Sequence, residues 1–236
     1  MVDKEIYGQP SFVLENELVS LAITKLGGHM APVVFGAANE RQIRPYYISP
    51  WQDENHADMP AEVLVPLRGD FFCLPFGGNA TPYQNQKYPV HGETATGEWT
   101  FVDSEEVEPG VSRLRLVLDT LVRKGQVTKE VTLRDGHPVI YQRHCVKHFV
   151  GPTPVGHHAI LAMPDEVGTF AISTSPFRLG MTNPGVFSDP ANGEYQMLAE
   201  GKTFCDVREI PTLFRDPAVV DCSRLPLQRG FADLFA

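Results

Sequence analysis

The sequence lacks the features by which nucleic-acid-binding and membrane-spanning proteins are usually recognised. It has no cluster of Lys and Arg, and its formal net charge of −9 disfavours binding to a phosphate backbone. No apolar run approaches the roughly 18 residues that are needed to span a bilayer. The first residues contain no basic segment followed by an apolar run. We therefore expect no signal peptide, no nucleic-acid or membrane partner, and a cytoplasmic protein.

Motifs for nucleophilic and nucleotide chemistry are also absent. The four cysteines lie far apart and form no C-x-x-C motif, which favours free thiols in a reducing compartment. There is no G-x-S-x-G elbow and no phosphate-binding loop of the G-x-G-x-x-G or G-K-[ST] type. These absences disfavour a serine or cysteine hydrolase and a nucleotide-binding protein, and we predict no cofactor.

What the chain does contain is typical of a β protein. Its 236 residues, 42% of them hydrophobic and 21% charged, suit one globular domain with a substantial core. Twenty glycines and twenty prolines interrupt the sequence too often for long helices but suit strands and turns. We therefore predict an all-β fold with a single domain over residues 1–236.

Several segments have the periodicity of antiparallel strands. Residues 18–26 and 30–35 flank the turn signal Gly27-Gly28 and predict a hairpin. Further along, apolar and polar residues alternate in segments joined by tight turns, which predicts a three-stranded meander over 112–122, 127–133 and 139–150. Residues 157–163 begin another strand. We interpret the proline-rich stretch 36–66 as a long loop that runs over the surface or across a binding face.

Two polar segments interrupt the apolar pattern and are candidates for a site. In "LRGDFFCLPFGGN" (67–79), glycines next to Asn79 would let the backbone approach a ligand, and the amide can both donate to and accept from a hydroxyl group. A plain turn with Asn79 in a left-handed conformation is the alternative. His91-Gly92, in "YPVHGETATGEWTF", is the second segment, and a lone histidine is more often structural than catalytic.

A third segment brings two adjacent histidines to the head of a strand. In Gly156-His157-His158 only one imidazole can face a given site, because neighbouring residues on a strand point to opposite sides. The preceding strand carries His144 and His148, which share a face if no bulge intervenes. Imidazole is a common metal ligand, so a metal site is one interpretation, although the spacing matches no recognised zinc signature.

Taken in order, these segments resemble the galactose mutarotase-like superfamily, which includes the aldose 1-epimerases. "ITKLGGHM" is similar to the opening hairpin of that family. "PFGGN", then His91-Gly92 followed by Trp99, then Gly156-x-His158 come in the family order. The resemblance covers roughly residues 18–165, and this chain is shorter than typical members.

The resemblance implies an antiparallel β-supersandwich with an open sugar-binding groove. His91 matches the histidine that binds the sugar near its ring oxygen, and His158 matches the general acid. A glutamate near the C-terminus is the base in that family. Anomer interconversion needs one proton given to the ring oxygen and one taken from the anomeric hydroxyl, which such a pair can do. A histidine that titrates near neutral pH suits the acid.

The chain departs from the family pattern in three places. The family's Asn-Arg is here Asn79-Ala80, so a sugar-hydroxyl donor is missing or is supplied by Arg68. No arginine follows His91-Gly92 closely, which disfavours a phosphorylated sugar. The C-terminal base has no match, and the carboxylates that can replace it are Glu93, Asp189, Glu194 and Glu209.

The leading hypothesis is therefore an aldose 1-epimerase type of isomerase whose partner is a small aldose. His158 and His91 would be catalytic, and the substrate-binding residues would be Asn79, Arg68, His157 and Trp99. One alternative is a non-catalytic carbohydrate-binding protein on the same scaffold. Another is a histidine-ligated metalloprotein with a sandwich or barrel fold.

Overall fold

The computed structural model describes residues 4–37, 41–79, 81–186, 188, 191 and 196–227. Antiparallel strands dominate these residues, and the described α-helix is the single turn α1 (Glu93–Thr96). The predicted all-β class is confirmed. No described helix is long and apolar enough to cross a membrane. The chain divides into two compact units, Met1–Ala162 and Met163–Ala236, and a single domain over residues 1–236 stays a prediction.

The first unit contains a six-stranded antiparallel sheet. Its strand order is β1-β2-β3-β4-β5-β10, with β1 at Lys4–Ile6, β2 at Gln9–Glu15, β3 at Val19–Thr24, β4 at Met30–Phe35, β5 at Asp70–Cys73 and β10 at Gly156–Ala159. The predicted hairpin is confirmed as β3 and β4, and the strand expected to begin at residue 157 is β10. Between β4 and β5 the described chain has no strand of its own and forms two 3₁₀ turns, Pro50–Asp53 and Glu62–Leu64.

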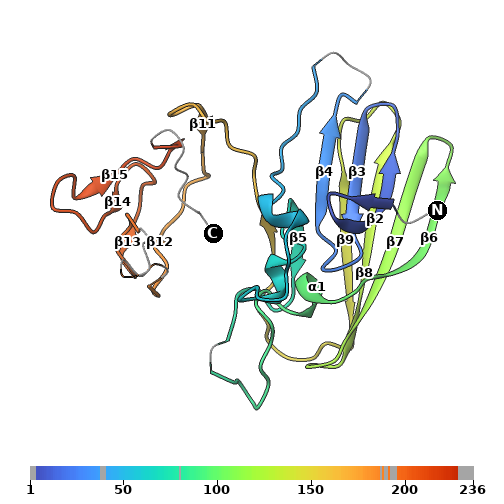
Figure 1. Ribbon diagram of the computed structural model, residues 1–236, viewed down its shortest axis with the longest axis horizontal. Coiled ribbons are helices and arrows are strands. Elements are labelled where there is room, and N and C mark those ends of the chain that lie inside the picture. The colour runs from blue at the N-terminus through green and yellow to red at the C-terminus, as the bar shows by residue number, and fades with distance from the viewer. Residues whose placement is uncertain are drawn as a thin grey trace. The chain divides into compact units, whose positions relative to one another are not determined.

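A four-stranded sheet of order β6-β7-β8-β9 faces the first sheet (Figure 1). Its strands are β6 at Thr100–Glu108, β7 at Val111–Thr120, β8 at Gly125–Arg134 and β9 at Tyr141–Lys147. The predicted meander is confirmed as β7, β8 and β9. Strand β6 was missed because its side chains are mostly exposed and its sequence has no apolar alternation. Pairing with β7 makes it a strand.

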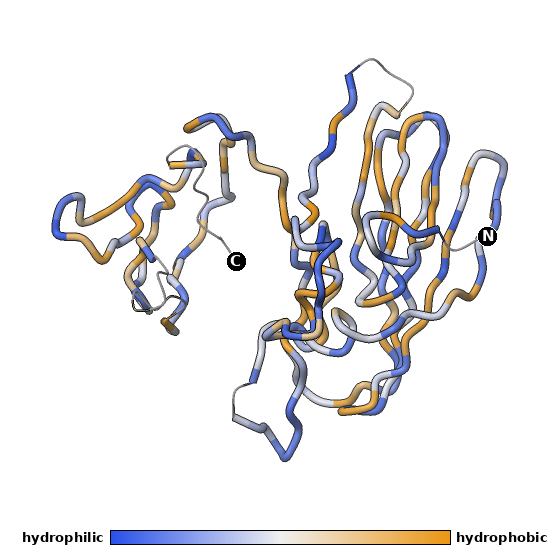
Figure 2. The backbone as a smooth tube through the Cα atoms, in the orientation of Figure 1, coloured by the Kyte–Doolittle hydropathy of each residue, from blue (hydrophilic) through white to orange (hydrophobic). Residues whose placement is uncertain are grey.

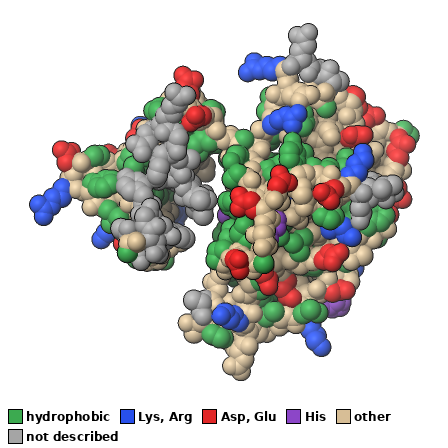
Figure 3. Space-filling view, viewed as in Figure 1, with side chains coloured by type: hydrophobic (Ala, Val, Ile, Leu, Met, Phe, Trp, Pro, Cys, Tyr) green, Lys and Arg blue, Asp and Glu red, His purple; other side chains and the backbone are tan. Residues whose placement is uncertain are grey.

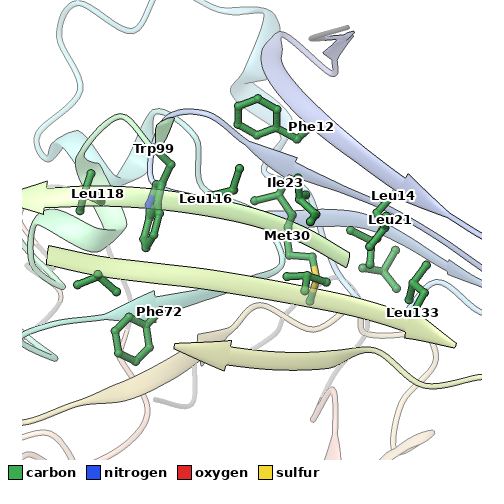
Figure 4. Packing of buried hydrophobic residues seen from close by; sticks show 14 of the residues in the cluster. Phe12, Leu14, Leu21, Ile23, Met30, Phe72, Trp99, Leu116, Leu118 and Leu133 are labelled. Carbon is green, nitrogen blue, oxygen red and sulfur yellow. The ribbon is translucent and has the colours of Figure 1, made fainter. Parts of the chain in front are cut away.

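The core lies between these two sheets (Figure 4). Alternation along the strands, seen as alternating colour in Figure 2, directs one set of side chains inward. Leu114, Leu116 and Val131 are fully buried there. Trp99 is fully buried as well, and its indole N–H donates to the carbonyl oxygen of Thr94 at 3.0 Å. Burial of this apolar surface is the main stabilising contribution to the sandwich.

A charged side chain also lies in this core. The β8 pattern places Lys129 on the same face as Val127 and Val131, and only 1% of Lys129 is exposed. Its ammonium group donates to the carbonyl oxygen of Gly28 and lies 5.4 Å from the centre of the Trp99 ring. Burial lowers the pKa of Lys129 to about 8. The sequence pattern identified the apolar members of this face but not the lysine among them.

The second unit is built from short ladders. Strand β11 (Phe170–Ala171) pairs with β16 (Arg224–Leu225), β12 (Gly180–Met181) with β13 (Thr203–Phe204), and β14 (Ile210–Pro211) with β15 (Val219–Val220). Each strand has only two residues. Such short strands explain why the sequence shows little periodicity beyond Pro164.

Candidate functional site

The histidines gather around the ladder between β5 and β10. In its register His157 lies opposite Phe72, and His158 lies opposite Phe71. Because adjacent strand residues point to opposite faces, the two histidines belong to different clusters. We call the group with His158 the outer cluster and the group with His157 the inner cluster, since Phe72 belongs to the core between the sheets.

The outer cluster is a set of stacked rings. His29 stacks on Phe71 with ring centroids 4.0 Å apart, and Phe71 stacks on His158 at 4.9 Å. His91 meets His158 edge-on at 4.9 Å and Phe76 at 5.2 Å. Thus the structure brings together His91 and His158, which are 67 positions apart in the sequence.

Backbone geometry fixes the position of His91. Its φ is +64°, an uncommon conformation for a side-chain-bearing residue. The N–H of His91 donates to the carbonyl oxygen of Gly77 at 2.7 Å, and the N–H of Gly77 donates to His91 Nδ1 at 3.3 Å. In the neutral ring Nδ1 is therefore an acceptor, and Nε2 carries the proton. Such held, unfavourable backbone conformations cluster at functional sites.

The glycine after His91 is required by close packing of the backbone. Gly92 has φ +79°, and a Cβ atom there would lie 2.1 Å from the carbonyl oxygen of Leu74. We expect Gly92→Ala to lower the free energy of unfolding by about 3 kcal/mol or more, because strain and a backbone clash act together. Gly77→Ala is the matched control, since φ is +83° there and nothing lies within 4 Å of the new Cβ.

The control should cost only the conformational strain, about 1–2 kcal/mol. Urea unfolding of the two variants measures the difference. Equal losses of stability would show that the contact with Leu74 does not explain why glycine follows His91.

Burial keeps the outer-cluster histidines neutral. Burial, together with the smaller effect of the nearby charge of His158, lowers the pKa of His91 to about 4. Burial also lowers the pKa of His158, which the charge of Asp70 opposes. His29 is completely buried, and burial lowers its pKa to about 3. His158 Nδ1 is a buried atom with no hydrogen-bond partner among the described residues.

The four predicted substrate-binding residues have different surroundings. Trp99 is sealed in the core. Asn79 uses its amide within its own loop, donating to the carbonyl oxygen of Gln86 and accepting from the N–H of Tyr88. His157 lies in the inner cluster, on the face of the ladder opposite His158. None of these three side chains is joined to His91 or His158 by a hydrogen bond that the structure describes.

Arg68 is fully buried and holds backbone segments together. Its guanidinium donates to the carbonyl oxygens of Ile6, Tyr7 and Pro66 and to the side chain of Gln52. Every guanidinium nitrogen is thereby occupied. A sugar-binding role for Arg68 stays a prediction, and these bonds do not favour it.

The four candidate carboxylates also have different surroundings. Glu93 accepts hydrogen bonds from the backbone N–H groups of Leu121 and Val122, so it supports a turn. Glu209 lies in the second unit, and Asp189 and Glu194 lie outside the described residues. The buried carboxylate beside the histidines is Asp70. Its sequence context does not identify it as a site residue, because only the strand register reveals its neighbours.

Other features bear on the alternative hypotheses. Among the described residues, no group of three or more His, Cys, Asp or Glu side chains could hold a metal ion. On the face shown in Figure 3, acidic and basic side chains are interspersed over the first unit. Neither observation identifies a metal ion or a charged molecule that would bind at the histidine clusters.

Comparisons with known proteins give no family assignment. No family model and no curated protein matches this chain. Among solved structures it is similar to the Slr1438 protein from Synechocystis sp. PCC 6803, with a TM-score of 0.42 and 14% sequence identity. The match covers 57% of this chain and 48% of that protein, so it spans about half of the solved structure's length. A structural similarity at this level gives no evidence about function.

Proposed function

We propose that this protein interconverts the anomers of an aldose, as an aldose 1-epimerase type of isomerase on a β-supersandwich of the galactose mutarotase-like kind. The supporting observation is the half-buried pair His91 and His158, whose rings lie 4.9 Å apart. Phe76 adds an apolar ring edge beside them. Apolar surface with a few convergent polar groups is the usual composition of a small-molecule site.

The chemistry requires one proton to move between two oxygens on the same carbon. His158, as a neutral base, takes the proton from the anomeric hydroxyl while the bond between the anomeric carbon and the ring oxygen breaks. The Nε2–H of His91 stabilises the negative charge that develops on the ring oxygen. His158 then returns its proton to the ring oxygen, giving the open-chain aldehyde. Reclosure on the other face reverses these steps and yields the second anomer.

This assignment differs from the general acid that the family resemblance implies for His158. Lowered pKa values leave both rings neutral at neutral pH, and a neutral imidazole is a base or a hydrogen-bond donor, not an acid of useful strength. The contact from Gly77 makes His91 the donor. One base and one fixed donor suffice, so this mechanism requires no carboxylate.

Polarimetry of freshly dissolved α-glucose and α-galactose tests the proposal, and its pH dependence tests the mechanism. We expect the acceleration to be greatest above the ordinary histidine pKa of about 6.5, because burial lowers the pKa of both histidines and leaves His158 unprotonated there. The rate should fall at lower pH as His158 is protonated. A rate that rises from pH 8 to pH 6 would indicate an acid role instead. No acceleration across a panel of aldoses would refute the isomerase.

The second candidate function is carbohydrate binding without turnover. It is the better candidate if turnover needs the carboxylate base of the resembled family, because no carboxylate among the described residues is hydrogen-bonded to His91 or His158. Saturable binding of an aldose, measured by calorimetry together with an unchanged rate of mutarotation, would select it.

A further inference from the structure

The inner cluster is built from three strands that meet at one end of the sandwich. Strand β10 supplies His157, β5 supplies Asp70 and Phe72, and β9 supplies Gln142 and His144. The strands β9 and β10 are the last in their respective sheets. These polar side chains therefore occupy the interior face of the sandwich where both sheets end.

A buried carboxylate organises the cluster. His157 Nδ1 lies 3.0 Å from Asp70 Oδ2, and Gln142 Nε2 donates to the same oxygen at 2.8 Å. Burial by itself raises the pKa of Asp70, but the hydrogen bonds from His157 and Gln142 outweigh it and lower the pKa. An ionised carboxylate only accepts hydrogen bonds, so Nδ1 of His157 carries a proton. In the neutral ring Nε2 is then an acceptor, and the side chain is 41% exposed.

The amide of Gln142 has its orientation settled by the same contact. Because its Nε2 donates to Asp70, its Oε1 is left as an acceptor, and this buried atom has no partner among the described residues. The amide nitrogen of Gln142 thus binds Asp70, and the amide oxygen of Gln142 is left as an unused acceptor.

His144 contributes a second unpartnered atom and an apolar surface. Its ring stacks on Phe72 at 4.1 Å and meets His157 edge-on at 5.1 Å. Its Nε2 is buried without a partner among the described residues. Burial lowers the pKa of His144 to about 2, so the ring is neutral. Buried polar atoms are nearly always hydrogen-bonded, and two unpaired atoms in one cluster call for a partner that is not part of the chain.

We propose that His157, Gln142 and His144 form a second binding site, which takes the hydroxyl groups of a small neutral polyol. Two acceptors, His157 Nε2 and Gln142 Oε1, suit O–H donors. His144 Nε2 is the third polar atom of the site. The carboxylate of Asp70 repels anions, and a metal lacks three suitable ligands among the described residues. This site lies on the opposite face of the ladder from His158 and does not depend on the proposed isomerase activity.

Titration with myo-inositol, monitored through the ring ¹⁵N signals of the histidines, tests the proposal. This polyol has no anomeric carbon and cannot be a substrate of an isomerase. We expect saturable shifts of the His144 and His157 signals, with affinity weakened about tenfold or more in His157→Phe. The exposed His137, on the turn before β9, offers a matched control, and His137→Gln should bind like the wild type.

Four results would overturn the proposal. The first is no response of His144 and His157 up to about 100 mM, far above the millimolar range of weak ligands, which would leave ordered water as the partner of the unpaired atoms. The second is an equal response to inorganic phosphate. The third is a response confined to His91 and His158, which would place the polyol in the outer cluster. Unchanged binding in folded His157→Phe would also contradict it.

Discussion

Replacing His158 with phenylalanine is expected to lower the rate of aldose mutarotation by about 100-fold or more, which is the usual contribution of a positioned acid–base group. Phenylalanine keeps a flat ring in the stack on Phe71 but removes both nitrogens. The fold should therefore persist while the base is lost. The measurement is the first-order rate of optical rotation with freshly dissolved sugar.

Two controls separate chemistry from structure. His137→Gln removes an exposed histidine and should leave the rate unchanged. The far-ultraviolet circular dichroism and the unfolding midpoint of His158→Phe should remain near those of the wild type. A folded His158→Phe variant with the wild-type rate would remove this residue from the mechanism.

The second large effect concerns Lys129 and the dependence of stability on pH. Lys129 has a folded-state pKa of about 8, lowered from 10.5 chiefly by burial. Between these two values the unfolded chain holds a proton that the folded chain has released, so stability rises with pH. Below pH 8 the lysine is charged in both states and the full cost of its burial is present. Above about 10.5 that cost is gone. The shift corresponds to about 3 kcal/mol.

Urea unfolding of the wild type and of Lys129→Met between pH 7.5 and pH 10.5 measures this effect. Other groups titrate in the same range, so the quantity of interest is the difference between the two proteins. We expect the wild type to gain about 3 kcal/mol relative to Lys129→Met over this interval. Lys147→Met, at an exposed position on β9, should retain the wild-type gain. Parallel curves for the wild type and Lys129→Met would show that the buried amine does not titrate in this way.

The elements that could be predicted carry a local signal in their own residues. Strands β7 and β8 have one buried face each, so their periodicity is visible without knowledge of their partners. Strands β3 and β4 do not alternate in this way, and their signal is two apolar segments on either side of the turn residues Gly27-Gly28. Strand β6 is polar and mostly exposed, and only the backbone of β7 makes it a strand. The same limit applies to Lys129, because a charged residue in the sequence gives no sign of the burial that the packed sheets impose on it.

The candidate site shows a similar division. The sequence identified His91, Gly92 and His158 through their motifs, and the structure brings the two imidazoles together. Arg68 and Trp99, predicted to bind substrate, are fully buried. Sequence spacing does not reveal burial, because burial depends on strands and loops from distant parts of the chain. His29 and Asp70 were missed for the same reason.

The all-β class, the hairpin, the meander and the candidate histidines could be predicted from the order of the amino acids alone. Which of the adjacent residues His157 and His158 faces which cluster depends on the folded chain, because the pairing register of β10 with β5 sets the face of each side chain. Folding also lowers the pKa of His91 and His158. A pKa depends on burial and on neighbouring charges, and both arise only when distant segments pack together.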